Sequence, residues 1–249
     1  MTTSDGPSPH VELHHLGGAA DSVALICVPY AGGSPAIFRS WPKSLPSIDF
    51  YALGLPGREA RLAAPPFTAL DPLVASAVEA LQPLAERPFA LFGHSMGGLI
   101  AFETAKRLLR NNAAVPVHLF VSGFRAPHLS DPKPPLFDLP RLEFLDELRR
   151  LNASVFDPFE HLELVELMIP TLRADFRLVQ TYVYHSGPTL TCPITAFGGS
   201  HDSEVSDWQL REWRQHTSAA FVTKVLPGGH FSLHTAGRAL LEEIARQLN

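Results

Sequence analysis

Short apolar runs alternate with amphipathic stretches along most of this 249-residue chain, and no other feature limits its possible folds as strongly. The alternation is typical of a mostly parallel β-sheet with helices on both faces. We predict strands at Val11–His15, Val23–Val28, Ile48–Leu53, Phe89–Phe92, Val117–Ser122, Pro193–Phe197 and Ala220–Leu226. We predict helices at Leu70–Ala85, Gly97–Asn111, Asp207–Gln215 and Thr235–Leu248. A hydrophobic content of 45% suffices for one large core, so we expect a single α/β domain over residues 1–249.

The alternation breaks between about residues 126 and 188. This segment begins with Ala126–Pro140, which contains five prolines. Three helical stretches are predicted after it, near Arg141–Leu151, Pro158–Met168 and Thr171–His185. A helical block between two core strands predicts a lid over the carboxyl edge of the sheet, where open α/β sheets bind ligands.

Composition and charge argue against several classes of protein. A net charge of −5 does not suit nucleic acid, which needs a basic face. No run reaches the roughly 18 apolar residues of a membrane span. Residues 1–10 lack the basic and apolar regions of a signal peptide, so we expect a cytoplasmic protein. Two cysteines are too few for a disulfide framework, and no feature demands assembly, so we expect a monomer.

The turn Gly93–Gly97 is the strongest candidate for chemistry. It reads G-x-S-x-G between a predicted strand and a predicted helix, which is the context of a nucleophile elbow. Such a turn holds its serine in a strained backbone conformation and exposes the hydroxyl at the sheet edge. Ser95 is therefore the candidate nucleophile. The alternative is a glycine-rich turn that carries a surface serine.

A serine hydroxyl needs a base to take its proton, and in this fold the chain order is Ser, acid, His. Among twelve histidines, His230 follows the last predicted strand and reaches the same sheet edge as Ser95. His234 lies one helical turn further on, and His94 is expected to pack beneath the elbow. The other histidines precede the acid, belong to the lid or end a helix. We assign the role of base to His230.

The acid is expected after the strand Pro193–Phe197, where the next turn contains Asp202. Its carboxylate would accept a hydrogen bond from His230 and fix the tautomer of the ring. Glu204 and Asp207 are rivals that we interpret as a solvated loop residue and a helix N-cap.

Two other interpretations of these carboxylates are weaker. Some hydrolases of this fold place the acid one strand earlier, but after Val117–Ser122 the first carboxylate is Asp131. His201 beside Asp202 suggests a metal pair, but no further ligand spacing supports it.

The expected oxyanion hole uses two backbone N–H groups. One belongs to Met96, the residue after the nucleophile, and the other to Ala31, in the loop after the strand Val23–Val28. A donor of this kind contributes a factor of roughly 10² to 10³ in rate. Gly32-Gly33 in the same loop also fits a tight turn. Phosphate-loop, dinucleotide, H-E-x-x-H and C-x-x-C motifs are absent from the sequence, so we expect no metal and no nucleotide cofactor.

Five strings give the chain a family resemblance from about Leu25 to its end. They are Cys27-Val28-Pro29-Tyr30-Ala31-Gly32-Gly33-Ser34, Leu55-Pro56-Gly57-Arg58-Glu59, Phe92-Gly93-His94-Ser95-Met96-Gly97-Gly98, Leu172-Arg173-Ala174-Asp175-Phe176 and Gly228-Gly229-His230-Phe231. The chain resembles stand-alone type II thioesterases, which accompany polyketide and nonribosomal peptide synthases. The nucleophile string is shared by many hydrolases, whereas the first two strings and the fourth are more specific.

The resemblance implies an α/β-hydrolase fold and hydrolysis of acyl thioesters through an acyl-serine. Family members clear stalled or wrongly primed acyl groups from the phosphopantetheine arm of carrier proteins, so an acyl or peptidyl carrier protein is the implied partner. Ser95, Asp202 and His230 match the family's triad, Met96 and Ala31 match its oxyanion positions, and the inserted helices match its mobile lid. Basic residues that would suit an acidic carrier protein are Arg58, Arg61, Arg149 and Arg150.

Two departures leave the acyl preference open. The family often has a Gly-Gly-Thr-type turn where this chain has residues 151–154, and Ala is common at the position of Gly98. Three other functions stay open at this point: a medium-chain thioesterase of fatty acid synthesis, an esterase or lipase for free esters, and a non-catalytic binding module.

Overall fold

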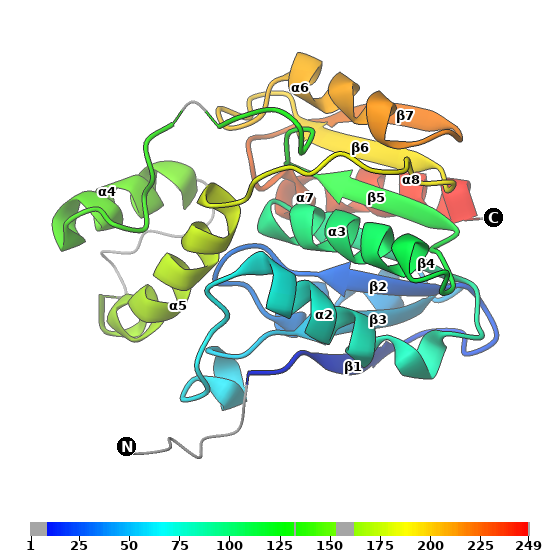
Figure 1. Cartoon of the computed structure of the whole chain (residues 1–249), viewed down its shortest axis with the longest axis horizontal. Helices are drawn as coiled ribbons and strands as arrows, with labels where there is room; N and C mark the ends of the chain where they lie inside the picture. Colours follow the sequence, from blue (N-terminus) through cyan, green and yellow to red (C-terminus); the bar gives the residue numbers. More distant parts are fainter. Residues whose placement is uncertain (1–8, 132, 153–161, 249) are drawn as a thin grey trace.

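The computed structural model describes residues 9–131, 133–152 and 162–248, and its centre is a seven-stranded sheet (Figure 1). The strand order is β1-β3-β2-β4-β5-β6-β7, and only the edge strand β1 is antiparallel to its neighbour. The strands are β1 (Glu12–Gly17), β2 (Ala24–Val28), β3 (Asp49–Gly54), β4 (Phe89–His94), β5 (His118–Ser122), β6 (Ile194–Gly199) and β7 (Phe221–Leu226). All seven predicted strands and the mostly parallel sheet are confirmed.

The helices pack on both faces of this sheet (Figure 1). They are α1 (Trp41–Ser44), α2 (Leu70–Ala80), α3 (Met96–Arg110), α4 (Arg141–Asn152), α5 (Leu162–Gln180), α6 (Asp207–Arg211), α7 (Ser232–Thr235) and α8 (Gly237–Leu248). Two clusters of buried apolar residues lie on the two faces of the sheet, one on each face. Along β2, Ile26 packs with residues of α2 and α3, whereas Leu25 and Cys27 pack with residues of α1 and α8. Burial on both faces explains why the central strands are continuous apolar runs.

Two predicted helices are interrupted in the structure. Pro83 follows the end of α2, and residues 82–84 form a 3₁₀ turn there. Proline has no N–H to continue an α-helix, and in the shorter 3₁₀ turn its missing donor costs little. Helix α6 also passes into a 3₁₀ helix, Glu212–His216. The predicted last helix, Thr235–Leu248, is present as α8, which begins two residues later, and the short helix α7 precedes it.

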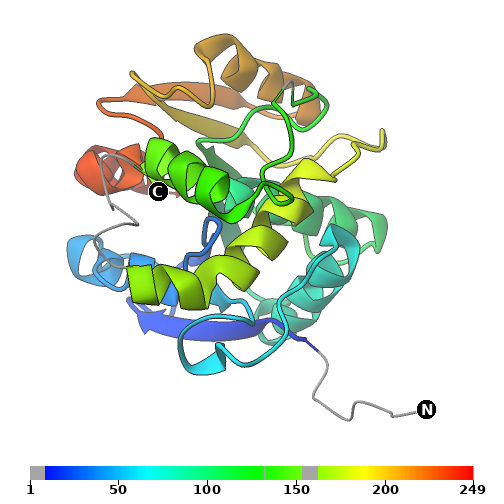
Figure 2. The ribbon, with the colours of Figure 1, turned by 90° about the vertical axis from the view of Figure 1, so that its left-hand side faces the viewer.

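The segment between β5 and β6 carries α4 and α5, which we call the inserted helices (Figures 1 and 2). The arrowheads of β2 and β5 point toward them, so they lie beyond the carboxyl edge of the sheet (Figure 1). The prediction of two helices meeting near Pro170 is wrong, because α5 continues through this proline. Its buried residues Val165, Ala174 and Leu178 lie on both sides of Pro170, and their packing offsets the lost hydrogen bond. Residues 158–161 of the predicted second helix lie outside the described residues.

The inserted helices have a small apolar cluster of their own. It consists of Phe144, Leu145, Leu148 and Val165. Arg173 of α5 covers the Phe144 ring with its guanidinium 4.4 Å from the ring centroid and donates to the Leu139 carbonyl at 2.7 Å. In the described part of the chain, no helix combines the length and the apolar character that crossing a bilayer requires.

Candidate active site

Ser95 lies on a strained turn between β4 and α3. Its φ of 51° and ψ of −121° are rare for a residue with a side chain. The turn is compact, because a Cβ on Gly93 would lie 2.0 Å from the Gly97 carbonyl oxygen and a Cβ on Gly97 would lie 2.1 Å from that of Val28. The Ser95 N–H donates to the Ser122 carbonyl at 2.7 Å, which ties the turn to β5. Only glycine therefore fits at positions 93 and 97, on either side of the turn.

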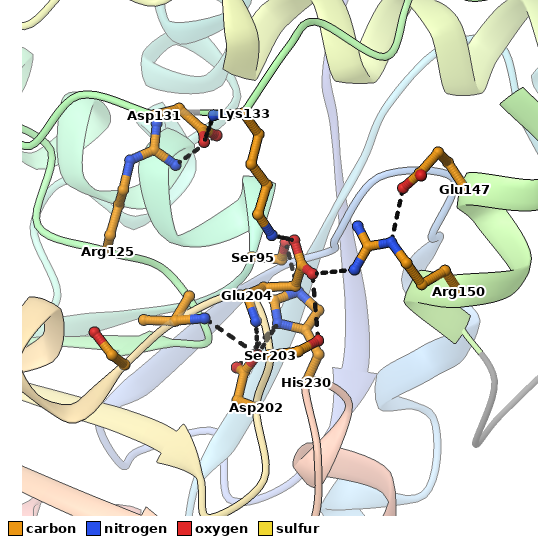
Figure 3. Close-up of polar contacts among 12 residues, drawn as sticks. Ser95, Arg125, Asp131, Lys133, Glu147, Arg150, Asp202, Ser203, Glu204 and His230 are labelled. Atoms are coloured by element: carbon orange, nitrogen blue, oxygen red, sulfur yellow. Dashed lines mark hydrogen bonds and ion pairs between the residues drawn. The ribbon is translucent and has the colours of Figure 1, made fainter. Parts of the chain in front are cut away.

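The structure brings the predicted nucleophile, base and acid together (Figure 3). His230 Nε2 lies 3.1 Å from Ser95 Oγ, and His230 Nδ1 lies 3.0 Å from Asp202 Oδ2. Because a carboxylate can only accept, Nδ1 carries the proton and Nε2 is free to accept from the serine. The Asp202 side chain is fully buried, and its Oδ1 also accepts the N–H groups of Glu204 (2.8 Å) and Val205 (3.2 Å). The acid is thus fixed by its own loop, independently of His230.

His94 lies directly beneath this group, as predicted. Its ring centroid is 5.2 Å from that of His230, and its Nδ1 lies 2.9 Å from Ser122 Oγ. Burial, reinforced by the neighbouring His230 and His234, lowers the pKa of His94 well below its ordinary value. The ring therefore stays neutral and places no positive charge beside the base.

Of the two predicted oxyanion donors, Ala31 lines the same cavity as Ser95, and Met96 directly follows Ser95 in the chain. Met96 is the first residue of α3, so its N–H is one of the free donors at a helix N-terminus. Ala31 lies in the loop after β2, where the Gly33 N–H donates to the Tyr30 carbonyl at 2.8 Å and closes a tight turn. Among the described residues, no hydrogen bond occupies the N–H of Met96 or of Ala31. Both N–H groups are available to a ligand.

A cavity of about 320 Å³ lies between Ser95 and the inserted helices. Its apolar wall contains Leu148, Leu172, Phe176 and Val179. Its polar wall contains Lys133, Arg150 and Glu204. The cavity therefore combines an apolar surface with a charged border, and α4 contributes to both through Leu148 and Arg150.

The interpretation of Glu204 as a solvated loop residue is wrong. Its carboxylate accepts hydrogen bonds from Lys133 Nζ at 2.5 Å and from Arg150 Nη1 at 2.9 Å (Figure 3). Arg150 also donates a hydrogen bond to Glu147. Burial raises the pKa of Glu204, but the hydrogen bonds and charges of the two cations outweigh it, so the pKa lies below its usual range. We call Lys133, Glu204 and Arg150 the charged clamp.

Asp207 is not an N-cap. Ser206 is the N-cap of α6, where it forms a capping box with Gln209. Asp207 is the first helical residue and forms an ion pair with Arg211. Among the described residues, no side-chain hydrogen bond or ion pair joins Glu204 or Asp207 to His230, whose ring nitrogens face Asp202 and Ser95. In the ranges that the structure describes, no three potential metal ligands lie together.

Arg58 is not available to a partner protein, so the interpretation of this residue as part of a docking surface is wrong. Its side chain is only 4% exposed and pairs with Asp175 of α5 at 2.9 Å. Arg61 is partly buried and donates to the His10 carbonyl at 2.7 Å. Arg58 and Asp175 lie in two separate family strings, and nothing in the sequence signals that these two residues meet.

A mostly parallel seven-stranded sheet with a serine on a strand-to-helix turn and a His–Asp pair behind it defines an α/β-hydrolase. A sequence profile of the thioesterase domain family matches residues 23–249, and the chain belongs to this family. It is therefore a hydrolase that acts on thioesters.

Similar proteins agree with this assignment. Gramicidin S biosynthesis protein GrsT of Aneurinibacillus migulanus is 39% identical, covering 92% of this chain and 90% of GrsT. The structure of the type II thioesterase BorB from the borrelidin biosynthetic cluster has a TM-score of 0.89 and 34% identity, covering 96% of this chain and 98% of BorB. The chain is thus related to type II thioesterases of nonribosomal peptide and polyketide biosynthesis.

One similar protein carries a different name. Linear gramicidin dehydrogenase LgrE of Brevibacillus parabrevis is 41% identical, covering 92% of this chain and 89% of LgrE. The present chain has no dinucleotide-binding G-x-G-x-x-G in its sequence, and it carries Ser95 on its nucleophile turn. The match to the thioesterase family profile therefore assigns this chain to the thioesterases rather than to the dehydrogenases.

Proposed function

We propose that this thioesterase hydrolyses acyl groups from the phosphopantetheine arm of an acyl or peptidyl carrier protein, and so edits a polyketide or nonribosomal peptide synthase. The observation that carries the proposal is the Ser95–His230–Asp202 hydrogen-bonded chain at the wall of an acyl-sized cavity. Phosphopantetheine belongs to the substrate, and the proposal includes no cofactor of the enzyme's own. It retains the cytoplasmic location expected from the sequence.

In the first half of the reaction, His230 Nε2 takes the Ser95 hydroxyl proton while Oγ attacks the thioester carbonyl carbon. The N–H groups of Met96 and Ala31 donate to the resulting oxyanion. The carbon–sulfur bond then breaks, and the imidazolium returns its proton to the leaving sulfur. A thiol with a pKa of about 8.5 leaves more readily than an alkoxide or an amine.

In the second half, water enters and His230 takes one of its protons. The hydroxide attacks the acyl-serine, the same two N–H groups stabilise the oxyanion, and Ser95 Oγ leaves with the proton from His230. The free acid and the resting enzyme result. Asp202 acts throughout by holding Nδ1–H and by stabilising the imidazolium.

The test compares hydrolysis of one acyl group on a holo carrier protein with hydrolysis of its p-nitrophenyl ester. We expect a large preference in kcat/KM for the carrier-bound thioester, and its loss in Ser95→Ala. Equal or faster turnover of the free ester would instead indicate an esterase.

Two further measurements separate the remaining rivals. A profile from acetyl to dodecanoyl that peaks at medium chains would favour a fatty-acid-type thioesterase. Failure of Ser95 to react with a fluorophosphonate probe would favour a binding module. An editing enzyme is expected to react with the probe and to accept short acyl groups.

A further inference from the structure

We propose that the buried ion pair between Arg58 and Asp175 positions the oxyanion loop, defined as residues 29–34, and that one half of the oxyanion hole therefore depends on the docking of α5. This inference rests on the proposed role of the Ala31 N–H. Arg58 and Asp175 are positioning residues here, because neither is placed against the reacting atoms.

The Asp175 carboxylate binds the oxyanion loop directly. Its side chain is 1% exposed, and its Oδ2 accepts the Gly32 N–H at 2.7 Å. That N–H belongs to the peptide that joins Ala31 to Gly32. The hydrogen bond therefore fixes the peptide plane next to the N–H that Ala31 would offer to the oxyanion.

Arg58 holds the same loop two peptides further on, at the peptide that joins Gly33 to Ser34. Its Nη1 donates both to Asp175 Oδ2 at 3.1 Å and to the Gly33 carbonyl at 3.0 Å, while Nη2 donates to Asp175 Oδ1 at 2.9 Å. Its Nε donates to the Pro56 carbonyl at 3.2 Å. One guanidinium and one carboxylate thus fix the N–H of Gly32 and the C=O of Gly33.

Helix α5 also closes on the loop through close packing. Gly32 has a φ of +73°, and a Cβ at this position would lie 2.6 Å from Leu172 Cδ2. One turn before Asp175, Thr171 Oγ1 donates to the Gly57 carbonyl at 2.5 Å, beside Arg58. Moving α5 away would break the ion pair with Arg58, the hydrogen bond from the Gly32 N–H and the hydrogen bond from Thr171.

The two oxyanion donors therefore have different supports. The Met96 N–H is fixed by the elbow glycines and by α3, which belong to the sheet region. The Ala31 N–H is fixed by contacts from α5, which belongs to the inserted segment. An undocked α5 would leave the nucleophile intact and the oxyanion hole incomplete, which links closure over the substrate to the start of chemistry.

The test uses Asp175→Asn with Asp49→Asn as its matched control. Asp49 is equally buried and pairs with Arg87 and His15, but it lies at the start of β3, at the opposite edge of the sheet. For Asp175→Asn we expect kcat to fall by about 10- to 100-fold with KM changed less than threefold, since a full oxyanion donor contributes about 10²- to 10³-fold. Asp49→Asn is expected to keep kcat within twofold while losing thermal stability.

Two binding measurements separate positioning from general damage. An acyl boronate, which mimics the oxyanion, is expected to bind Asp175→Asn more weakly by the same factor as the loss in kcat. A thioether analogue of the acyl-pantetheine has no carbonyl and is expected to bind normally. Equal weakening of both ligands would overturn the proposal.

If Asp175→Asn does not fold, Arg58→Lys provides a second test of the proposal, because it keeps the buried positive charge. A lysine cannot hold Asp175 and the Gly33 carbonyl with two parallel bonds, so we expect the same split between kcat and KM at smaller size. Unchanged kcat in a folded Asp175→Asn or Arg58→Lys would overturn the proposal. Ser95→Ala in the same assay separates the two failures, because turnover by this variant would overturn the proposed function itself.

Discussion

Helix α3 begins directly after Ser95 and helix α5 lines the cavity beside it, but different forces hold the two helices. Helix α3 packs with apolar side chains, among them the fully buried Leu99, Ile100 and Ala101, against the central strands and α2. Helix α5 reaches the core with few buried apolar residues and relies on polar contacts made by Thr171 and Asp175. The sheet region thus resists change through packing, whereas the inserted helices depend on a few specific hydrogen bonds and ion pairs.

This difference assigns separate tasks to the two regions. The elbow, the base and the acid all belong to loops at the carboxyl edge of the sheet, so nucleophile geometry is independent of the inserted helices. The charged clamp and the contacts of Asp175 join those helices to the same edge. Substitutions in the sheet region should abolish chemistry or folding, and substitutions in the contacts of the inserted helices should adjust access and transition-state binding.

The largest expected effect is at Ser95. Ser95→Ala should lower single-turnover acyl release by about 10⁴-fold or more, because the remaining site has no nucleophile. Ser95→Gly should be equally inactive but more stable than Ser95→Ala by about 1–3 kcal/mol, since glycine relieves the strain at φ 51°. Urea unfolding of both variants measures the difference. Equal stabilities would show that the sheet does not hold this residue under strain.

The next largest expected effect is on the stability of the fold, at Gly97 in the nucleophile elbow. Gly97→Ala should lower the free energy of unfolding by about 3 kcal/mol or more, because its Cβ would meet the Val28 carbonyl oxygen, which is held within the sheet. The control is Gly237→Ala at the start of α8, where a Cβ meets nothing within 4 Å. It should be neutral or stabilising by up to about 1 kcal/mol. Similar urea midpoints for both variants would contradict the rigid elbow.

The sheet and the elbow could be predicted from the sequence because their signals are local. An apolar run, a G-x-S-x-G turn and an amphipathic helix follow one another within residues 89–110. The positions of Asp202 and His230 follow from strand order, because parallel strands end at the same edge. These residues meet at hydrogen-bond distance as that order predicts.

The contacts of the inserted helices could not be predicted, for physical reasons. Arg58 and Asp175 are 117 positions apart, and no periodicity reports which charged residues meet in the interior. Pro170 normally breaks a helix, and only tertiary packing allows α5 to continue through it. Glu204 was misinterpreted because its cations come from two other segments of the chain. The sequence pattern therefore does not predict which polar residues pair with each other when they are far apart in the chain.

The stability of the protein in acid should depend on two buried histidines of the sheet region, His118 and His216. Burial lowers the pKa of His118 to about 4, and burial together with His128 and Lys106 lowers that of His216 to about 4. The unfolded chain binds these protons near pH 6.5, so stability is present above pH 6.5 and is lost as the pH falls toward 4. Each ring contributes up to about 3 kcal/mol over this window.

His118→Gln and His216→Gln should each flatten the fall of the thermal midpoint between pH 6.5 and 4. The exposed His201 provides the control, and His201→Gln should leave the slope unchanged. A slope that persists in the double variant would assign acid sensitivity to other groups, with the ion pairs of the inserted helices as the next candidates.

The smallest effect is expected at the charged clamp. Glu204→Gln removes the charge that holds Lys133 and Arg150, and partly exposed ion pairs of this kind contribute only about 1 kcal/mol or less. We expect kcat for the carrier-bound thioester to stay within twofold, while kcat/KM for the p-nitrophenyl ester rises about two- to fivefold as the polar wall of the cavity loosens. Salt at 0.5 M should produce the same rise in the wild type and none in the variant, since it screens the same contacts.

Glu242→Gln, which removes an exposed ion pair with Arg238 on α8, is the control and should keep the wild-type response to salt. A response to salt that survives in Glu204→Gln would assign the control of access to contacts other than the clamp.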